Sequence, residues 1–306
     1  MTHFFERLFF NPKWYHFGII FLLLPFSFLY GTLLFLKRFL SRPQSYALPI
    51  ISIGNLIVGG SGKTPFAIAL IHYLQKEGVR RIFYISRGYG RRSKGMVLVK
   101  VNDSINCKVE ESGDEAMLVA KSTDASVIVS ENRQKAIKKA KELGAELIIL
   151  DDAFSKSAIK KYDILLEPAE IRNPFVFPAG PFREFPFVKR YANLKLKEGK
   201  DYKRKVSYEN LTQRMLLVTA IANPQRLEAF FPENVVGKLY FPDHAYFKKE
   251  EIIDKMRELS VTSLLVTQKD YVKLEQFKLP ISIIKLKLEI DKNILKRIKE
   301  EACKQK

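Results

Sequence analysis

A short glycine-rich segment between a strand-like run and a helix-like run constrains the fold more than any other feature of this sequence. The segment is GNLIVGGSGKTP (54–65), and the apolar run PIISIG (49–54) leads into it. The helix expected to begin near Lys63 points its positive end at the loop. Three glycines can take backbone conformations that aim successive N–H groups at one anion: Gly59, Gly60 and Gly62. Strand, loop and helix in this order predict a phosphate-binding loop on a parallel α/β sheet.

The chemistry of the loop follows from its last residues. Lys63 is expected to hold β- and γ-phosphate oxygens of ATP and counts among the catalytic candidates, while Thr64 would give its hydroxyl to magnesium. Ile57 stands where the Walker pattern has its first glycine, and Pro65 is compatible with the first turn of a helix. The predicted ATP-binding residues are Gly59, Gly60, Ser61, Gly62, Lys63 and Thr64.

A second apolar strand ends in two carboxylates. In ELIILDD (146–152), Asp151 and Asp152 follow a continuous apolar run. Ligands of open α/β sheets bind at the carboxyl ends of the strands, so these aspartates and the phosphate loop are expected at the same edge. They are the predicted magnesium ligands, together with Thr64. The alternative is that the two aspartates only cap the following turn.

The rest of the chain alternates short apolar runs with helical stretches, as in a largely parallel sheet covered on both faces. A basic stretch from Lys189 to Arg214 breaks this rhythm, and a second set of strands follows it. The predicted fold class is therefore α/β, a P-loop NTPase-like mostly parallel sheet with a smaller second α/β domain and an N-terminal membrane-associated helix. The expected divisions are an anchor (1–44), a kinase-like domain (45–205) and a C-terminal domain (206–306).

The N-terminal helix is expected from a run without any Asp, Glu, Lys or Arg. The run WYHFGIIFLLLPFSFLYGTLLFL (14–36) is long enough to span the hydrocarbon of a bilayer. Pro25 and Gly31 interrupt it, and basic residues flank both ends, so the charges give no orientation. A full crossing and a kinked helix lying in the interface both fit this pattern.

Charge and cysteine content restrict the partners. The net charge is +19, which suits nucleic acid, anionic lipid or a phosphorylated substrate. No nucleic-acid-binding motif accompanies the charge, so we expect no nucleic-acid partner. Cys107 and Cys303 are too few for a disulfide framework, which favours a reducing cytosol.

Eight ordered motifs resemble those of the tetraacyldisaccharide 4'-kinase family, the lipid A 4'-kinases of Gram-negative bacteria. Each motif is short, but together they span nearly the whole chain in the order of the family. They are LLPFSFLYG (23–31), GNLIVGGSGKTP (54–65), SRGYGR (86–91), GDE (113–115), SENR (130–133), FPAGPFRE (177–184), FPDH (241–244) and TQKD (267–270).

The resemblance implies transfer of the ATP γ-phosphate to the 4'-hydroxyl of tetraacyldisaccharide 1-phosphate. This glycolipid kinase would act as a monomer at the cytoplasmic face of the bacterial inner membrane. Asp114 then matches the catalytic acid–base residue and His244 its histidine partner, as a sugar hydroxyl needs a carboxylate to receive its proton. Glu115, Arg133 and Arg183 match substrate- or phosphate-binding positions. Taken without the family, Asp114 and Glu115 read as a helix N-cap and His244 as a surface-loop residue.

One motif departs from the family. Where the family reads DDGFQ, this chain reads DDAFS (151–155). Ala153 replaces a glycine that can adopt a positive φ, and Ser155 replaces an amide that can contact a ligand. Both aspartates are retained, so metal binding is still expected, whereas the geometry of the loop is open.

Two rival functions remain at this point. A P-loop ATPase acting as a membrane-associated nucleotide switch has a similar loop, KGGxGKT, but the chain carries Val58 where that class has lysine. A kinase of a different glycolipid is suggested by DDAFS.

Overall fold

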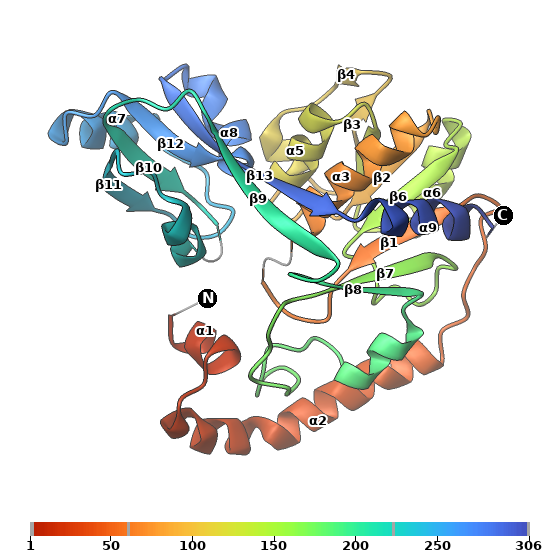
Figure 1. Cartoon of the computed structure of the whole chain (residues 1–306). Helices are drawn as coiled ribbons and strands as arrows, with labels where there is room; N and C mark the ends of the chain where they lie inside the picture. Colours follow the sequence, from red (N-terminus) through yellow and green to blue (C-terminus); the bar gives the residue numbers. More distant parts are fainter. Residues whose placement is uncertain (1–2, 60–61, 222–223, 305–306) are drawn as a thin grey trace. The chain divides into compact units, whose positions relative to one another are not determined.

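The computed structural model describes residues 3–59, 62–221 and 224–304 of the 306-residue chain. The chain forms two compact units, each assembled from separate stretches of sequence (Figure 1). The first unit contains residues 1–63, 145–203 and 290–306, and the second contains residues 64–144 and 204–289.

The first unit is built on four parallel strands in the order β6-β1-β7-β8. Every residue of β1 and β6 is buried, as the continuous apolar runs predict for strands covered on both faces. Its elements are α1 (His3–Phe10), η1 (Trp14–His16), α2 (Phe17–Phe39), β1 (Ile50–Gly54), β6 (Leu147–Asp151), β7 (Tyr162–Glu167), η2 (Pro186–Tyr191), β8 (Leu194–Lys197) and α9 (Lys292–Cys303).

The second unit begins with strands in the order β4-β3-β5-β2, in which β2 and β5 are parallel and β3 is antiparallel to β5. Helix α5 packs against β3 and β5, and α6 packs against β2 and β5. The elements are α3 (Lys63–Lys76), β2 (Ile82–Ser86), β3 (Val97–Val101), β4 (Ser104–Ile105), α4 (Val109–Ser112), α5 (Asp114–Ser122), β5 (Ser126–Val129) and α6 (Arg133–Glu142).

A second sheet completes this unit, with the strand order β11-β10-β12-β13-β9. Strand β10, which lies between β11 and β12, is fully buried and parallel to both neighbours. The elements are β9 (Tyr202–Glu209), β10 (Met215–Thr219), η3 (Pro224–Phe230), β11 (Val235–Tyr240), α7 (Lys249–Glu258), β12 (Ser263–Thr267), α8 (Gln268–Leu274), η4 (Glu275–Phe277) and β13 (Ile281–Ile290).

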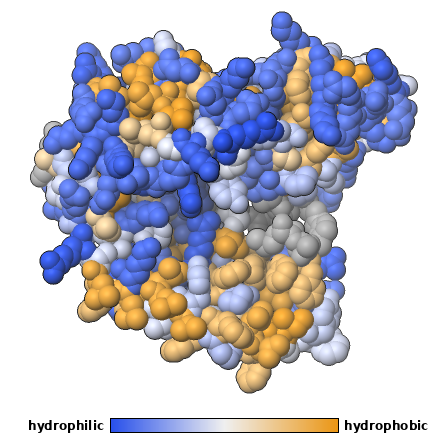
Figure 2. Space-filling model, turned by 180° about the vertical axis from the view of Figure 1, so that it is seen from behind, coloured by the Kyte–Doolittle hydropathy of each residue, from blue (hydrophilic) through white to orange (hydrophobic). Residues whose placement is uncertain are grey.

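Helix α2 packs along the first unit by one narrow face. Ile20, Ser27 and Gly31 are buried, and the Ser27 hydroxyl accepts a hydrogen bond from the Ala179 backbone N–H at 2.9 Å. A Cβ added at Gly31 would lie 2.6 Å from the Phe185 ring, so the helix can approach this closely only with glycine here. The remaining surface of α2 is apolar and exposed, and Figure 2 shows apolar residues gathered at the bottom of the molecule, where Figure 1 places α2.

The C-terminal end of α2 is tied to the same unit by an ion pair. Arg38 Nε and Nη2 lie 2.9 and 3.1 Å from the two carboxylate oxygens of Glu184, and both side chains are largely buried. The guanidinium also lies 4.5 Å from the centre of the Phe154 ring and donates to the Phe154 carbonyl. The helix is thereby joined to the turn that carries Asp151 and Asp152.

The predicted fold class is confirmed: a mostly parallel sheet with helices on both faces, a second sheet and an apolar N-terminal helix. The division at residues 44/45 and 205/206 stays a prediction. The Lys189–Arg214 stretch, which seemed to interrupt the strands, contains the end of η2 and all of β8 and β9. Along β9 every second side chain faces the core beside the sheet, and Val206 and Tyr208 pack against that core. Most side chains on the opposite face are charged and exposed.

Candidate functional site

The phosphate loop connects β1 to α3 as predicted from the sequence. Gly59 and Gly62 both adopt positive φ, +95° and +76°, which residues with a side chain rarely take. Gly60 and Ser61, two of the predicted ATP-binding residues, lie outside the described residues. Helix α3 starts at Lys63, so its N-terminal N–H groups follow directly after the glycines.

Lys63 lies at the centre of a polar group in the first unit. Its Nζ donates to Asn55 Oδ1 at 3.2 Å and lies 3.6 Å from Asp152 Oδ1. Arg183 Nη1 donates to the other oxygen of Asp152 at 2.6 Å. Burial alone would raise the pKa of the Asp152 carboxyl, but the two cations outweigh it and hold that pKa below its ordinary value. The structure thus brings together three predicted site residues, Lys63, Asp152 and Arg183.

The other predicted metal ligands have different positions. Asp151 is the last residue of β6 and is buried, and Thr64 is the buried second residue of α3. Within the described part of the chain, no group of three or more His, Cys, Asp or Glu side chains could hold a metal ion. The two carboxylates of Asp151 and Asp152 still suit magnesium, which usually takes one or two carboxylates and completes its shell with phosphate oxygens and water.

The DDAFS turn places its unusual backbone conformation one residue earlier than its sequence suggested. Asp152, with φ +47°, has the left-handed conformation, and Ala153 does not. Ala153 and Phe154 are buried, at 0% and 2% exposure, whereas Ser155 is exposed. The turn therefore accommodates alanine, and the substitution for glycine requires no strained backbone.

Close packing of this turn on β1 gives a stability prediction for Gly54→Ala. The added Cβ would lie 2.6 Å from Phe154 Cβ and 3.2 Å from the Phe154 nitrogen, so the turn must shift. We expect Gly54→Ala to lower the free energy of unfolding by about 1–3 kcal/mol, measured by denaturant unfolding. The matched control is Gly18→Ala in α2, where a Cβ meets nothing within 4 Å. Equal stability of the two variants would contradict the packing.

The second polar group is centred on Asp114, the first residue of α5. Asp114 is 3% exposed. Its carboxylate contacts His244, whose Nδ1 lies 2.9 Å from Oδ1 and 3.1 Å from Oδ2. His244 follows β11 in a loop and adopts φ +60°, an uncommon conformation for a histidine. Both residues belong to the second unit, although 130 positions separate them in the sequence.

Two lysines of α8 complete this group. Lys273 Nζ lies 3.3 Å from Asp114 Oδ2, and Lys269 Nζ lies 3.9 Å from the same oxygen. Lys269 also contacts Glu115 and Asp243, each at 3.4 Å. Spacing of four residues puts both ammonium groups on one face of the short helix. The result is a compact set of alternating charges around one buried carboxylate.

These contacts favour the ionised form of Asp114 and orient the His244 imidazole. Burial would raise the pKa of Asp114, but the hydrogen bond from His244 and the charges of Lys269 and Lys273 lower it to about 2. Lys269 Nζ lies 3.3 Å from His244 Nε2. Nε2 also lies 3.5 Å from Asp243 Oδ2, while Nδ1 faces the Asp114 carboxylate, to which it can only donate.

The SRGYGR loop packs directly over this group. Gly90 adopts positive φ, and a Cβ there would lie 2.8 Å from His244 Cβ. The Tyr89 ring packs edge-on against the His244 imidazole, with ring centroids 4.8 Å apart. A Cβ at Gly113 would lie 2.8 Å from the Tyr89 carbonyl oxygen, so both glycines are needed for the close approach.

Of the remaining predicted residues, Glu115 joins the Asp114 group through Lys269. Arg133 begins α6, and its buried side chain donates from Nη1 to the Ser130 carbonyl at 2.6 Å. Sequence reasoning missed five residues of the two groups: Asn55, Asp243, Lys269, Asp270 and Lys273. Four of them lie in motifs quoted above, Asn55 in GNLIVGGSGKTP, Asp243 in FPDH, and Lys269 and Asp270 in TQKD, for which the sequence alone assigned these residues no role.

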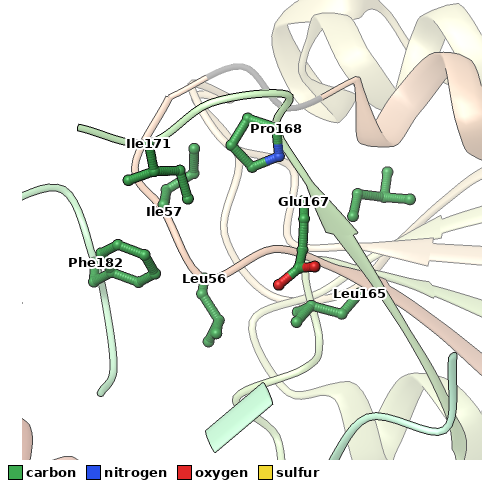
Figure 3. Close-up of a pocket in the computed structure, with 8 residues that line it drawn as sticks. Leu56, Ile57, Leu165, Glu167, Pro168, Ile171 and Phe182 are labelled. Atoms are coloured by element: carbon green, nitrogen blue, oxygen red, sulfur yellow. The ribbon is translucent and has the colours of Figure 1, made fainter. Parts of the chain in front are cut away.

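A small pocket in the first unit lies beside the segment that follows β1 (Figure 3). Its lining is apolar except for Glu167 and includes none of the predicted ATP-binding residues: Leu56, Ile57, Leu165, Leu166, Glu167, Pro168, Ile171 and Phe182. We therefore keep it separate from the phosphate loop.

Comparison with known proteins gives a consistent result over the whole chain. The model of the tetraacyldisaccharide-1-P 4'-kinase family matches residues 19–211 and 188–303. Tetraacyldisaccharide 4'-kinases from Helicobacter pylori strain HPAG1 and Aliarcobacter butzleri strain RM4018 are each 46% identical to this chain. The alignments cover 96% and 94% of this chain and 93% of each relative. One from Campylobacter jejuni subsp. doylei is 40% identical over 96% of the chain.

A solved structure agrees with the sequence relatives. LpxK from Aquifex aeolicus, crystallised in complex with ATP, superposes with a TM-score of 0.77 at 26% sequence identity. The match covers 93% of this chain and 99% of that protein.

Proposed function

The chain belongs to the tetraacyldisaccharide-1-P 4'-kinase family and is an ATP-dependent lipid A 4'-kinase, and we propose that Asp114 is the carboxylate that receives the proton of the attacking hydroxyl. The family resemblance expected from the eight motifs is thereby confirmed. The observation that carries the proposed role is the buried Asp114 carboxylate, hydrogen-bonded by His244 at 2.9 Å and ionised among cations.

In this proposal each group has one task. Lys63 and the loop N–H groups bind the β- and γ-phosphate oxygens, and Arg183 adds positive charge beside Asp152. The 4'-hydroxyl oxygen forms a bond to the γ-phosphorus while the bond from phosphorus to the ADP oxygen breaks. The hydroxyl proton passes to Asp114, whose orientation is held by the Nδ1–H of His244. Glu115 and Arg133 remain proposed contacts of the anionic acceptor.

Magnesium is the cofactor that the donor set fits. Asp151 and Asp152 would hold it together with phosphate oxygens, and Thr64 is the proposed hydroxyl ligand. When bound, the ion would neutralise charge on the phosphates. Lys63 and Arg183, which contact Asp152, would neutralise a further part of the phosphate charge.

We propose that α2 binds the cytoplasmic face of the inner membrane while lying against its own protein. Among the described residues, Trp14–Phe39 is the helical segment long and apolar enough to cross a bilayer. However, Ser27 and Arg38 are bonded to Ala179 and Glu184 of the same unit, which supports a helix lying in the interface. The monomeric state stays a prediction.

The membrane proposal predicts the effect of removing exposed apolar side chains. Phe21 and Leu22 are 76% and 71% exposed. Because they make few contacts within the protein, Phe21→Ser with Leu22→Ser should leave the fold intact and weaken flotation with phosphatidylethanolamine–phosphatidylglycerol vesicles at least about tenfold. Val236→Ser, at an exposed position of β11, is the control. Undiminished flotation of the double variant would contradict the proposal.

The kinase is distinguished from a nucleotide switch by whether ATP consumption depends on the acceptor. We expect ADP release to require tetraacyldisaccharide 1-phosphate and to equal the phosphorylated lipid formed, because Asp114 acts on an acceptor hydroxyl. Steady ADP release without lipid, at the rate seen with it, would instead support a switch.

A further inference from the structure

Lys273 is a buried cation that the proposed reaction does not use. It is 2% exposed, and its ammonium lies 3.3 Å from Asp114 Oδ2, 3.5 Å from Asp270 Oδ1 and 3.0 Å from the Ala245 carbonyl oxygen. The ammonium also lies 4.9 Å from the centre of the Phe247 ring. Because Lys273 is buried among these groups, we expect it to influence a substrate through them.

Asp270 fixes the other side of this lysine. It is fully buried and accepts hydrogen bonds from Thr219 Oγ1 at 2.7 Å, Thr267 Oγ1 at 2.8 Å and the Ala220 backbone N–H at 3.1 Å. Thr219 ends β10, and Thr267 ends β12. The carboxylate is therefore satisfied by the sheet itself and holds Lys273 at a defined place relative to two strand ends.

Asp270 and Lys273 also help to hold the backbone around His244. The Ala220 carbonyl accepts a hydrogen bond from the His244 backbone N–H at 3.1 Å. Lys273 binds the carbonyl of Ala245, the next residue along that loop. The backbone N–H of His244 is thus linked to Asp270 through Ala220, and the carbonyl of the next residue is bonded to Lys273. These contacts support the uncommon φ of +60° at His244.

We propose that Lys273, held in place by Asp270, is the positioning residue that keeps Asp114 ionised and oriented for the reaction. This inference rests on the proposed role of Asp114 as the proton acceptor. A buried carboxylate tends to take up a proton unless a cation compensates for its loss of water, and a proton acceptor must start in the ionised form. Lys273 supplies a cation that solvent does not screen.

Lys273 acts together with other groups around Asp114, which are more exposed or carry other contacts. They face Asp114 from three elements: His244 and Tyr246 from the loop after β11, Lys269 from α8, and Glu115 from α5. Lys269 is farther away, at 3.9 Å, more exposed, and shared with Glu115 and Asp243.

Lys273→Met, which removes the charge and keeps most of the volume, tests the inference. We expect kcat to fall about 10- to 100-fold with KM for ATP unchanged. The acid limb of the kcat/KM profile should move to higher pH, because Lys273 is one of the groups that, with His244 and Lys269, lower the pKa of Asp114. Lys255→Met, in a surface ion pair with Glu258, is the matched control and should change neither.

A double variant separates positioning from stability. Lys273→Met alone leaves Asp270 as a buried unpaired charge and should lower the unfolding midpoint. Adding Asp270→Asn removes that charge, so we expect the midpoint to recover while kcat stays low. Recovery of kcat together with stability would show a purely structural lysine and overturn the inference.

The outcomes distinguish this inference from the proposed function. Wild-type kcat and pH profile in Lys273→Met, with Asp114→Asn inactive, would overturn the role of the lysine and leave that of Asp114. Near-normal turnover in Asp114→Asn would overturn both.

Discussion

Replacing Asp114 by asparagine is expected to lower kcat by about 10²–10⁴-fold, the contribution of a positioned general base. Asparagine keeps the shape of the side chain, and its oxygen can still accept the hydrogen bond that His244 Nδ1 now donates at 2.9 Å. What is lost is the ability to take a proton. Affinity for ATP should be unchanged, because Asp114 and the phosphate loop belong to different polar groups.

The Asp114 prediction is checked by steady-state phosphorylation of the lipid together with equilibrium ATP binding on the same preparation. Asp124→Asn, an exposed carboxylate just beyond the end of α5, serves as the control and should behave as the parent enzyme. Near-normal kcat in folded Asp114→Asn would contradict the role assigned to this residue.

Lys63→Met should instead weaken ATP binding and transfer together, with kcat/KM for ATP reduced by about 10²–10³-fold. Lys63 is the first residue of α3, and its ammonium is placed by Asn55 at 3.2 Å and Asp152 at 3.6 Å. Methionine retains the length of the side chain but removes the charge that compensates the phosphates. The half-exposed Asp152 keeps its contact with Arg183, so folding should be preserved.

The control for this lysine lies on the same helix. Lys76→Met changes an exposed residue at the opposite end of α3, and ATP titration should give the affinity of the parent enzyme. A Lys63→Met protein that binds ATP and phosphorylates lipid as well as Lys76→Met would exclude the loop lysine from phosphate binding.

The strands could be predicted from the sequence where burial is continuous. IISIG and LIILD are apolar at every position but one, and both are fully buried strands within a residue of the predicted ends. YKRKVSYE in β9 was missed because charged residues alternate with the inward ones and mask a period of two. The short helix α8 was missed since only seven residues carry its pattern.

The two candidate sites also differ in how far they could be predicted from the sequence. The phosphate loop is local, so its glycines, Lys63 and the following helix could be read from twelve consecutive residues. The Asp114 group joins α5, the loop after β11 and α8 across more than 150 positions, and only the family motifs indicated Asp114 and His244. Lys273 lies outside every quoted motif, and no local pattern indicates that its ammonium meets Asp114.

This chain is expected to move the γ-phosphate of ATP to one hydroxyl of its glycolipid. The most direct measurement follows γ-labelled ATP in mixed micelles with tetraacyldisaccharide 1-phosphate, and with the same lipid lacking the 4'-hydroxyl. We expect label in a bis-phosphorylated product from the complete lipid and none from the 4'-deoxy lipid. Folded, ATP-binding protein that labels neither lipid, or both equally, would contradict it.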